Sequence, residues 1–254
     1  EDTGYMARAA YIMDGIMRKL GLHGQSFISM IVGFGCNVPG IMATRTLENK
    51  KDRMIAILIN PFMSCGGKIP IYMLFISVFF PNHGGTALFL IYTLGIVLAL
   101  IFGRIFSSIL FKGENSDFIM ELPPYRLPSF RSVIRNMWDK VWDFLHRAGT
   151  VILVVVASLW VLAVLPLGVE PYGQMSILGR IGTLIAPLFK LAGFGTWQAS
   201  VSLFSGIAAK EAVVATLGSV AKATTGSLTN MLHSIFTPLS SASFMTMILL
   251  YTPC

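Results

Sequence analysis

Charged residues are scarce in this chain of 254 residues, and their scarcity excludes most soluble folds. Only 12% of its residues are charged, against about 25% in a typical soluble domain, while 54% are hydrophobic. Cysteine is also rare. Three cysteines in apolar surroundings cannot form a disulfide framework, which excludes a disulfide-rich secreted protein. A phosphate-binding G-x-x-x-x-G-K-[ST] loop is absent from the sequence, so we do not expect the chain to hydrolyse a nucleotide.

Long apolar runs instead indicate a chain whose solvent is lipid. Residues 86–111 carry one charge, Arg104, and residues 148–169 carry none, so each run is long enough to span a bilayer. The net charge of +7 is spread over short segments between apolar runs, whereas a nucleic-acid binder gathers its basic residues on one face. We therefore predict an all-α polytopic transmembrane helical bundle. Its expected partner is the lipid bilayer, and we do not expect it to bind nucleic acid.

Three further apolar segments are interrupted by glycine, proline or charge. They are residues 27–44, 54–80 and 197–221, and we predict broken or re-entrant helices whose breaks approach one another. Residues 240–254 resemble the first half of another span. Segments 5–20 and 174–195 are more amphipathic, which leaves tilted spans, half-buried helices and interfacial helices open.

Lysine and arginine in the connections predict an orientation. They are frequent in residues 45–53 and 112–147 and absent from 81–85 and 168–173, so the first two should face the cytoplasm. Residues 131–147 have an apolar stripe at helical spacing, which favours a separate amphipathic helix on the inner membrane surface.

A short internal repeat connects the two halves of the chain. GFGCNVPGIMAT (33–44) and GIAAKEAVVAT (206–216) both begin with glycine, have a polar or thiol centre and end in Ala-Thr. Paired interrupted segments of this kind are typical of transporters built from repeats, with the site between them.

The first candidate site surrounds Cys36. We expect Asn37 to cap a helix that has Pro39 in its first turn, with the helix dipole favouring the metal-binding thiolate of Cys36. The alternative is that Cys36 is a small buried hydrophobe in a tight turn.

The second candidate site is the segment from Asn60 to Cys65, which also combines a cysteine with a predicted helix break. Asn60 is expected to cap a turn that Pro61 begins, and freed carbonyls, the Met63 thioether, the Asn60 amide oxygen and the Cys65 sulfur are possible donors. A packing kink with an incidental cysteine is the alternative.

Charge at membrane depth marks a third place. Lys210 and Glu211 are neighbours in an apolar segment, so at least one should face a cavity or a partner on another segment, unless Lys210 lies at a membrane interface.

Two further features concern Cys254 and the histidines. Pro253 has no amide hydrogen to donate to the Leu249 carbonyl, which places Cys254 beside a kink. The four histidines lie in or near loops, where we expect them to be solvated rather than ligands: His23, His83, His146 and His233.

Six motifs in a fixed order cover nearly the whole chain and resemble the membrane domain of ferrous iron transport protein B. They are EDTGYMAR (1–8), GFGCNVP (33–39), ATR (43–45), NPFMSC (60–65), AKE (209–211) and YTPC (251–254). Gly40 stands where this family more often has alanine. The resemblance implies a first gate segment at 1–80, a second at 147–254, and between them, at 81–146, a spanning helix with a cytoplasmic linker and an amphipathic helix.

The same resemblance implies function and partners. It implies uptake of Fe(II), as transported ion rather than cofactor, across a bacterial or archaeal cytoplasmic membrane. The metal path would use Cys36, Cys65 and Cys254, with Asn37, Asn60 and Met63 as secondary donors and Lys210 and Glu211 as pathway charges. The family carries an N-terminal GTP-binding domain that is not in this chain, so GTP would act only through that domain, and the chain is expected to be a fragment. Small cytoplasmic accessory proteins and a homo-oligomer are further expected partners.

Two other functions remain open. The gate segments also resemble parts of nucleoside-type permeases, so a carrier of small organic solutes is one alternative. A structural or sensory membrane subunit that transports nothing is the other, although buried charge argues against it.

Overall fold

The computed structural model describes residues 4–19, 21–47, 49–109, 129–165, 173–207, 209–224 and 226–251, and these residues form helices and turns without a strand. By length and composition, three helical runs could cross a membrane: Lys50–Phe79, Pro81–Ile109 and Phe130–Val164. A fourth is possible if α11 (Leu228–Ile235) and α12 (Pro238–Leu250), which are bent by 100°, form one span. The prediction of an all-α polytopic membrane protein with broken helices is therefore confirmed.

Two long helices correspond to the two predicted spans. Helix α6 (Gly84–Ile109) contains most of the first, and helix α7 (Phe130–Val164) contains most of the second. Residues 131–147 are helical as predicted, but α7 runs without a break through that segment into the apolar run, so the amphipathic helix is the first part of a longer helix. Its place on the inner membrane surface stays a prediction. Gly149 alone does not interrupt α7, since an isolated glycine lowers helix stability only by about 1 kcal/mol.

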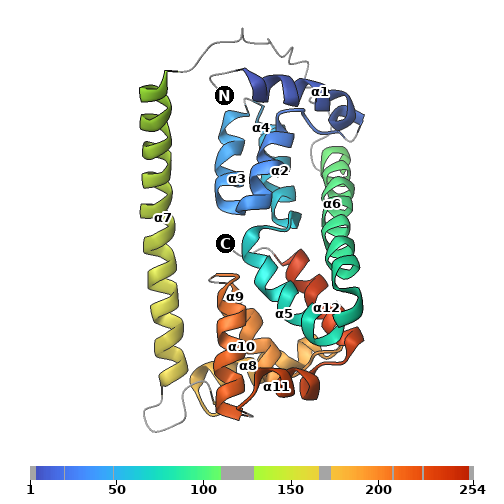
Figure 1. The fold of residues 1–254 in the computed structure, drawn as a ribbon, viewed down its shortest axis with the longest axis vertical. Helices are drawn as coiled ribbons and strands as arrows, with labels where there is room; N and C mark the ends of the chain where they lie inside the picture. Colours follow the sequence, from blue (N-terminus) through green and yellow to red (C-terminus); the bar gives the residue numbers. More distant parts are fainter. Residues whose placement is uncertain are drawn as a thin grey trace. The chain divides into compact units, whose positions relative to one another are not determined.

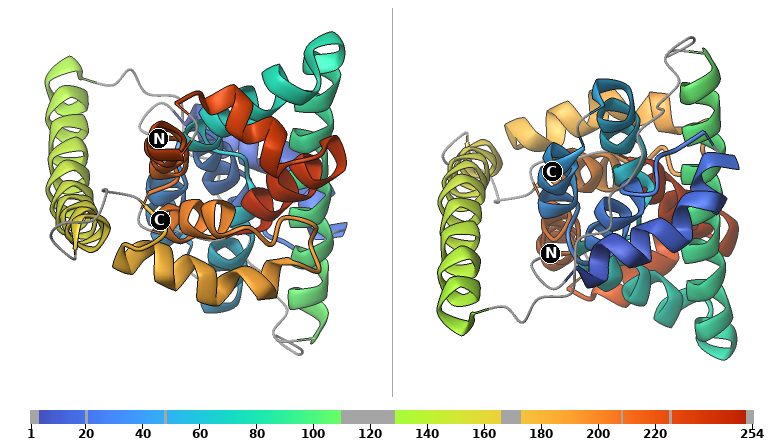
Figure 2. Two further views of the ribbon diagram at one scale, coloured as in Figure 1. Left: turned by 90° about the horizontal axis from the view of Figure 1, so that it is seen from below. Right: turned by 90° about the horizontal axis from the view of Figure 1, so that it is seen from above.

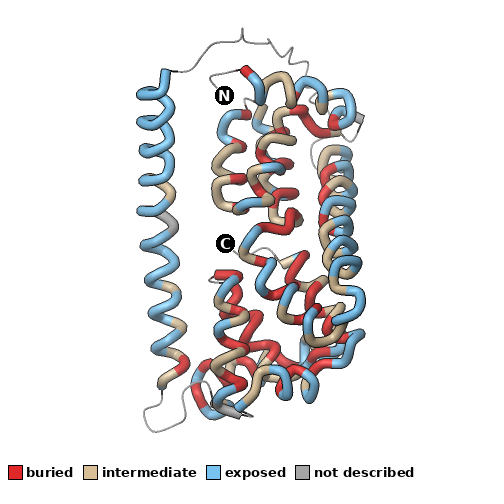
Figure 3. Tube along the Cα trace, viewed as in Figure 1, coloured by how far each residue is buried: buried red, intermediate tan, exposed pale blue. Residues whose placement is uncertain are grey.

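The helices group into two compact units, which are described separately. Unit 1 comprises Glu1–Cys65 and Leu94–Ala148, and unit 2 comprises Gly66–Thr93 and Gly149–Cys254. Both α6 and α7 therefore contribute residues to each unit. Most of α7 is exposed, as the pale blue tube in Figure 3 shows, and lipid is the natural cover for its apolar half.

Unit 1 is built from short helices. In chain order they are α1 (Tyr5–Lys19), α2 (Ser26–Gly35), α3 (Asn37–Ala43), the 3₁₀ turn η1 (Thr44–Thr46), α4 (Lys50–Ile59) and the 3₁₀ turn η2 (Asn60–Phe62). Helices α2 and α3 lie side by side (Figure 1). The predicted break in 27–44 is confirmed, since the chain leaves helical geometry at Cys36 with φ −153° and ψ 131°. The core includes Met30, Ile55 and Ile59, and α6 joins it through the stacked rings of Phe62 and Phe102.

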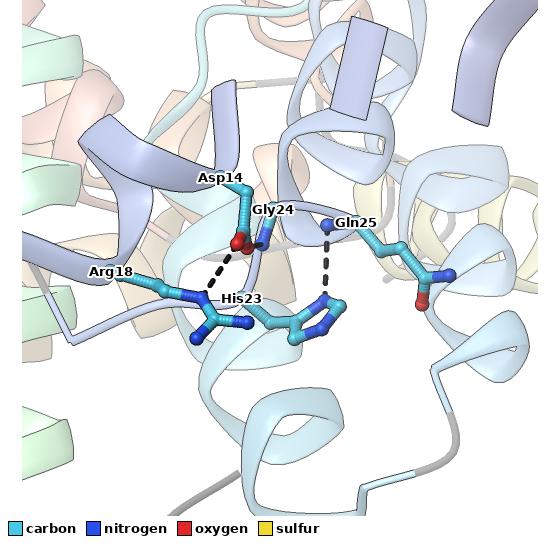
Figure 4. Close-up of polar contacts among 5 residues, drawn as sticks. All are labelled: Asp14, Arg18, His23, Gly24 and Gln25. Carbon is cyan, nitrogen blue, oxygen red and sulfur yellow. Dashed lines mark hydrogen bonds and ion pairs between the residues drawn. The ribbon is translucent and has the colours of Figure 1, made fainter. Parts of the chain in front are cut away.

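A polar clasp fixes the turn between α1 and α2 (Figure 4). The Asp14 carboxylate accepts hydrogen bonds from Arg18 Nε at 2.6 Å and from the Gly24 amide at 2.9 Å. His23 is 7% exposed, and its Nδ1 accepts a hydrogen bond from the Gln25 amide at 3.2 Å. The expectation of a solvated loop histidine is therefore wrong at His23, because the clasp folds this loop against the unit.

Unit 2 begins with the 3₁₀ turn η3 (Gly66–Lys68), α5 (Ile69–Phe79) and the 3₁₀ turn η4 (Pro81–His83). It continues with α8 (Ile177–Phe189), α9 (Trp197–Gly206), α10 (Ala212–Thr224), α11 and α12. The predicted breaks in 54–80 and 197–221 are confirmed at η2–η3 and between α9 and α10.

Small residues and aromatic rings hold unit 2 together. Helices α8 and α9 cross closely at Gly182, where a Cβ would lie 2.3 Å from Val201 Cγ2 (Figure 2 gives two further views). Phe75 packs on Phe236 and Phe244 with ring centroids 5.2 and 5.0 Å away. Every helical residue of α9 from Ala199 to Leu203 is buried, so α9 is the central helix of this unit.

Candidate functional site

The side chain of Asn60 lies in a narrow cradle in unit 1, formed by Gly33 on α2 and Gly40 on α3. Asn60 is fully buried, and its Nδ2 donates a long hydrogen bond of 3.5 Å to the Ser29 carbonyl. A Cβ on Gly33 would lie 2.2 Å from Asn60 Oδ1, and a Cβ on Gly40 would lie 2.8 Å from Asn60 Nδ2. Both glycines are therefore needed for the carboxamide to fit, a requirement of close approach that glycine alone meets.

The oxygen of this carboxamide has no hydrogen-bond partner among the residues that the structure describes. Asn60 Oδ1 is buried and unpaired, as are the hydroxyl oxygens of Ser29 and Ser64 in the same unit. Leaving a buried polar atom unpaired costs about 1–3 kcal/mol, so such atoms commonly mark a functional place. Carboxamide and hydroxyl oxygens are ligands suited to hard cations.

Asn37 points toward the same cradle. Its Oδ1 lies 3.7 Å from the position that a Gly33 Cβ would take, and the residue is buried. The expected helix-capping roles are wrong for both asparagines. Cys36 is the N-cap of α3, and Asn60 lies inside η2 rather than before it. The Asn60 side chain is directed toward Gly33 and Gly40 instead of toward a local backbone amide.

The cysteines differ in their surroundings. Cys36 is half-buried at the break between α2 and α3, and Cys65 is buried at the end of the segment that η2 begins. Met63 is 1% exposed and packs in the apolar core of unit 1, while Cys254 lies outside the described residues. Among the residues described, no group of three or more His, Cys, Asp or Glu side chains could hold a metal ion. A shared path for Cys36 and Cys65 stays a prediction.

Lys210 and Glu211 follow the break after α9 in unit 2. Lys210 is buried, with 3% of its surface exposed, whereas Glu211 is exposed. The Glu211 carboxylate nevertheless lies against η3, because a Cβ on Gly67 would be 2.5 Å from Glu211 Oε1. The charge pair thus approaches a segment distant in sequence, and its role in a pathway stays a prediction.

Sequence reasoning missed Lys68. This lysine is fully buried, and its Nζ donates a 3.0 Å hydrogen bond to the carbonyl of Leu249, 181 residues away at the end of α12. Pro253 has no amide hydrogen and therefore cannot donate a hydrogen bond to the carbonyl of Leu249. A lysine within an apolar run was a usable signal, because charge at membrane depth is rare. Its acceptor could not be found from sequence.

Tyr251 was missed as well, and it completes the internal repeat. Its hydroxyl donates to the Leu203 carbonyl on α9 at 3.0 Å, and its ring lies 3.7 Å from the position of a Cβ on Gly206. In unit 1, Asn60 bonds to a carbonyl of α2 and packs on Gly33 in the same way. Gly33 and Gly206 are the first residues of the two repeated motifs.

Each unit thus contains a helix–break–helix hairpin that is held by a residue at the end of a later helix. The hairpins are α2–α3 and α9–α10, and the helices that end beside them are α4 and α12. In unit 2 a further bond joins the hairpin, because Thr216 Oγ1 on α10 donates to Ser205 Oγ on α9 at 2.8 Å. This common plan supports the repeat that the sequence motifs predict.

A cavity of about 430 Å³ also lies in unit 2. It is lined mostly by apolar side chains of α7, α9 and α10, among them Leu153 and Trp160, with Ser205 and Thr216 as polar groups. It contains none of the predicted site residues, so it is separate from the candidate ion path.

Broken apolar helices arranged in two hairpins of one plan define a multi-pass helical membrane protein built from a repeat. The gate family described as "Nucleoside recognition" matches residues 1–79 and 145–254, and "Ferrous iron transport protein B C terminus" matches residues 88–140. The chain therefore belongs to the gate family. The resemblance predicted from the sequence motifs is confirmed.

Curated relatives agree with this assignment. The Fe(2+) transporter FeoB of Staphylococcus aureus (strain COL) is 43% identical over 255 residues, with all of this chain and 38% of the relative covered. The Fe(2+) transporter FeoB of Methanocaldococcus jannaschii is 44% identical, with all of this chain and 39% of the relative covered. A "Fe(2+) transport protein A/Fe(2+) transporter FeoB fusion protein" of Porphyromonas gingivalis is 39% identical, with 36% of the relative covered. The chain thus spans about two fifths of the length of these relatives. No solved structure shows significant similarity to it.

Proposed function

We propose that this chain is the permease region that carries ferrous iron across the cytoplasmic membrane of a bacterium or archaeon. The relatives named as Fe(2+) transporters match it along its whole length. The observation that carries the proposal is the Asn60 cradle, where an unpaired oxygen of a buried carboxamide lies at the junction of two helix breaks. Irregular backbone and unpaired polar groups survive at membrane depth only where they are buried in protein or line a pathway.

The donors of the path would act in sequence rather than as one closed site. Cys36 and Cys65 supply soft sulfur ligands, and Asn37 and Asn60 supply amide oxygens. Met63 and Cys254 are further candidate donors. Conduction needs binding that is strong enough for entry and weak enough for release, so dispersed donors suit a transported ion.

Energy and regulation would come from outside this chain. We propose that GTP acts through a separate domain of the full-length protein, and that the chain itself is not an enzyme. A small accessory protein is a proposed partner, and the fusion of the A and B proteins in one relative supports it. A homo-oligomer stays a prediction.

The test is uptake by liposomes that contain the full-length protein. With anaerobic ⁵⁵Fe(II) outside, wild-type liposomes should accumulate iron above protein-free liposomes, whereas a labelled nucleoside should not accumulate. Asn60→Asp keeps the shape of the side chain, so it should change the concentration dependence of iron uptake; Asn230→Asp, at an exposed position of α11, is the matched control. Nucleoside uptake without iron uptake would replace this proposal with the organic-solute carrier.

A further inference from the structure

Lys68 places a full positive charge inside unit 2. Its side chain is 0% exposed, and its ammonium group lies 3.0 Å from the Leu249 carbonyl at the end of α12. Burying an ammonium group in an apolar environment is unfavourable by several kcal/mol unless its partners compensate for the lost water. The buried ammonium group therefore depends on protein partners, and the Leu249 carbonyl is one of them.

The acceptor of this bond is a carbonyl that the local backbone leaves available. Helix α12 ends at Leu250, and the backbone is extended at Tyr251, whose amide makes the last helical bond, to the Met247 carbonyl. In the sequence beyond, Pro253 has no amide hydrogen that could donate to Leu249. The end of a helix also carries partial negative charge, which attracts a cation. A carbonyl oxygen freed in this way is the kind of ligand that ion pathways use.

A charged donor is not required to satisfy such a carbonyl. Among the residues that the structure describes, three other carbonyls accept from a distant side chain, and each has a neutral donor: Ser29 accepts from Asn60 Nδ2, Leu203 from the Tyr251 hydroxyl and Ala192 from the Ser243 hydroxyl. Leu249 instead accepts from an ammonium group. The difference indicates that positive charge, rather than a hydrogen bond alone, is what this position selects.

The neighbourhood adds negative charge. Glu211 Oε1 lies against Gly67, the residue before Lys68, so a carboxylate and the end of a helix flank the same short turn. The second buried lysine, Lys210, is the neighbour of Glu211 in sequence. The turn before Lys68 thus lies against residues of both charge signs, and the carbonyl at the end of α12 is the negative group that a cation at this position would meet.

We propose that the Leu249 carbonyl is a cation-binding position on the ion path and that Lys68 is a tethered cation that occupies it between transport events. The proposal rests on the function proposed above. A transported divalent ion displaces the ammonium group when it arrives, and the returning ammonium group promotes its release. If the ammonium group occupies the carbonyl in roughly nine molecules of ten, it weakens the apparent affinity for the ion about tenfold.

Substitutions at Lys68 in the full-length protein, reconstituted in liposomes, test this proposal. Lys68→Gln removes the charge but keeps an N–H donor, and Lys68→Arg keeps the charge. The matched control is Lys222→Met, which removes an exposed lysine near the end of α10. We expect the glutamine variant to lower the KM for Fe(II) uptake about tenfold and to lower kcat as well. The arginine and control variants should remain within about twofold of wild type.

Direct binding gives a second readout that does not depend on transport. Anaerobic equilibrium dialysis of the solubilised protein against Fe(II) should show tighter binding by Lys68→Gln and by Lys68→Met than by wild type. If Lys68 only caps α12, the uncharged variants lose stability and kcat while the KM and the binding constant stay unchanged, and the proposal is overturned. Absence of iron uptake by wild type would instead refute the proposed function, with the binding comparison still deciding the role of Lys68.

Discussion

Replacement of Gly33 by alanine tests the Asn60 cradle most sharply. The new methyl group would lie 2.2 Å from Asn60 Oδ1, far inside van der Waals contact, and the carboxamide is fully buried. Overpacking of this kind destabilises a protein by about 1–3 kcal/mol. Gly35→Ala is the matched control, because Gly35 lies on the same helix and a Cβ there meets no atom within 4 Å.

The assay is reversible unfolding of the detergent-solubilised full-length protein in an SDS titration. We expect the free energy of unfolding of Gly33→Ala to fall below that of Gly35→Ala by about 1–3 kcal/mol. Shortening the buried side chain with Asn60→Ala should relieve the clash, so the double variant should be more stable than the sum of the single changes allows. Equal stability of the two glycine variants, or strict additivity in the double variant, would refute the cradle.

Three further predictions follow from the same geometry. Tyr251→Phe removes the hydrogen bond to α9 and should lower the free energy of unfolding by about 0.6 kcal/mol in the same titration, while Tyr11→Phe, at an exposed position of α1, should change nothing. Gly67→Ala should be milder than the change on α2, because the exposed glutamate that packs on it can swing away; a loss above about 1 kcal/mol would contradict this. A thiol introduced at Asn82 should react with an impermeant maleimide outside the cell and one at Arg131 should not, and the reverse pattern would invert the predicted orientation.

The positions of the helix breaks could be predicted because their cause is local. Proline lacks an amide hydrogen and glycine lowers helix stability, so the interruptions near Cys36, at Asn60–Pro61 and after Gly206 are visible in the sequence. The continuity of α7 could not be predicted from its amphipathic first half, since a solvent-facing helix and a spanning helix can share one uninterrupted backbone.

The roles of individual polar residues depended on contacts between distant segments. Sequence rules assign an asparagine beside a helix break to helix capping. The Asn60 side chain instead packs against Gly33 and Gly40, which lie 27 and 20 residues earlier in the chain. The carbonyl of Leu249 was recognised as free from Pro253 alone, whereas its partner Lys68 is 181 residues away. Local chemistry therefore indicates which groups need partners, and only tertiary packing decides which partners they find.

The most direct test of the proposed function is anaerobic ⁵⁵Fe(II) uptake by the full-length protein with Cys36→Ser and Cys65→Ser. Serine keeps the size of each side chain but removes the soft sulfur ligand, so each variant should reduce uptake and the double variant should reduce it further. GTP hydrolysis by the soluble domain should remain nearly unchanged at normal protein levels. Uptake equal to wild type in the double variant would contradict a sulfur-lined iron path and would leave both cysteines as packing residues.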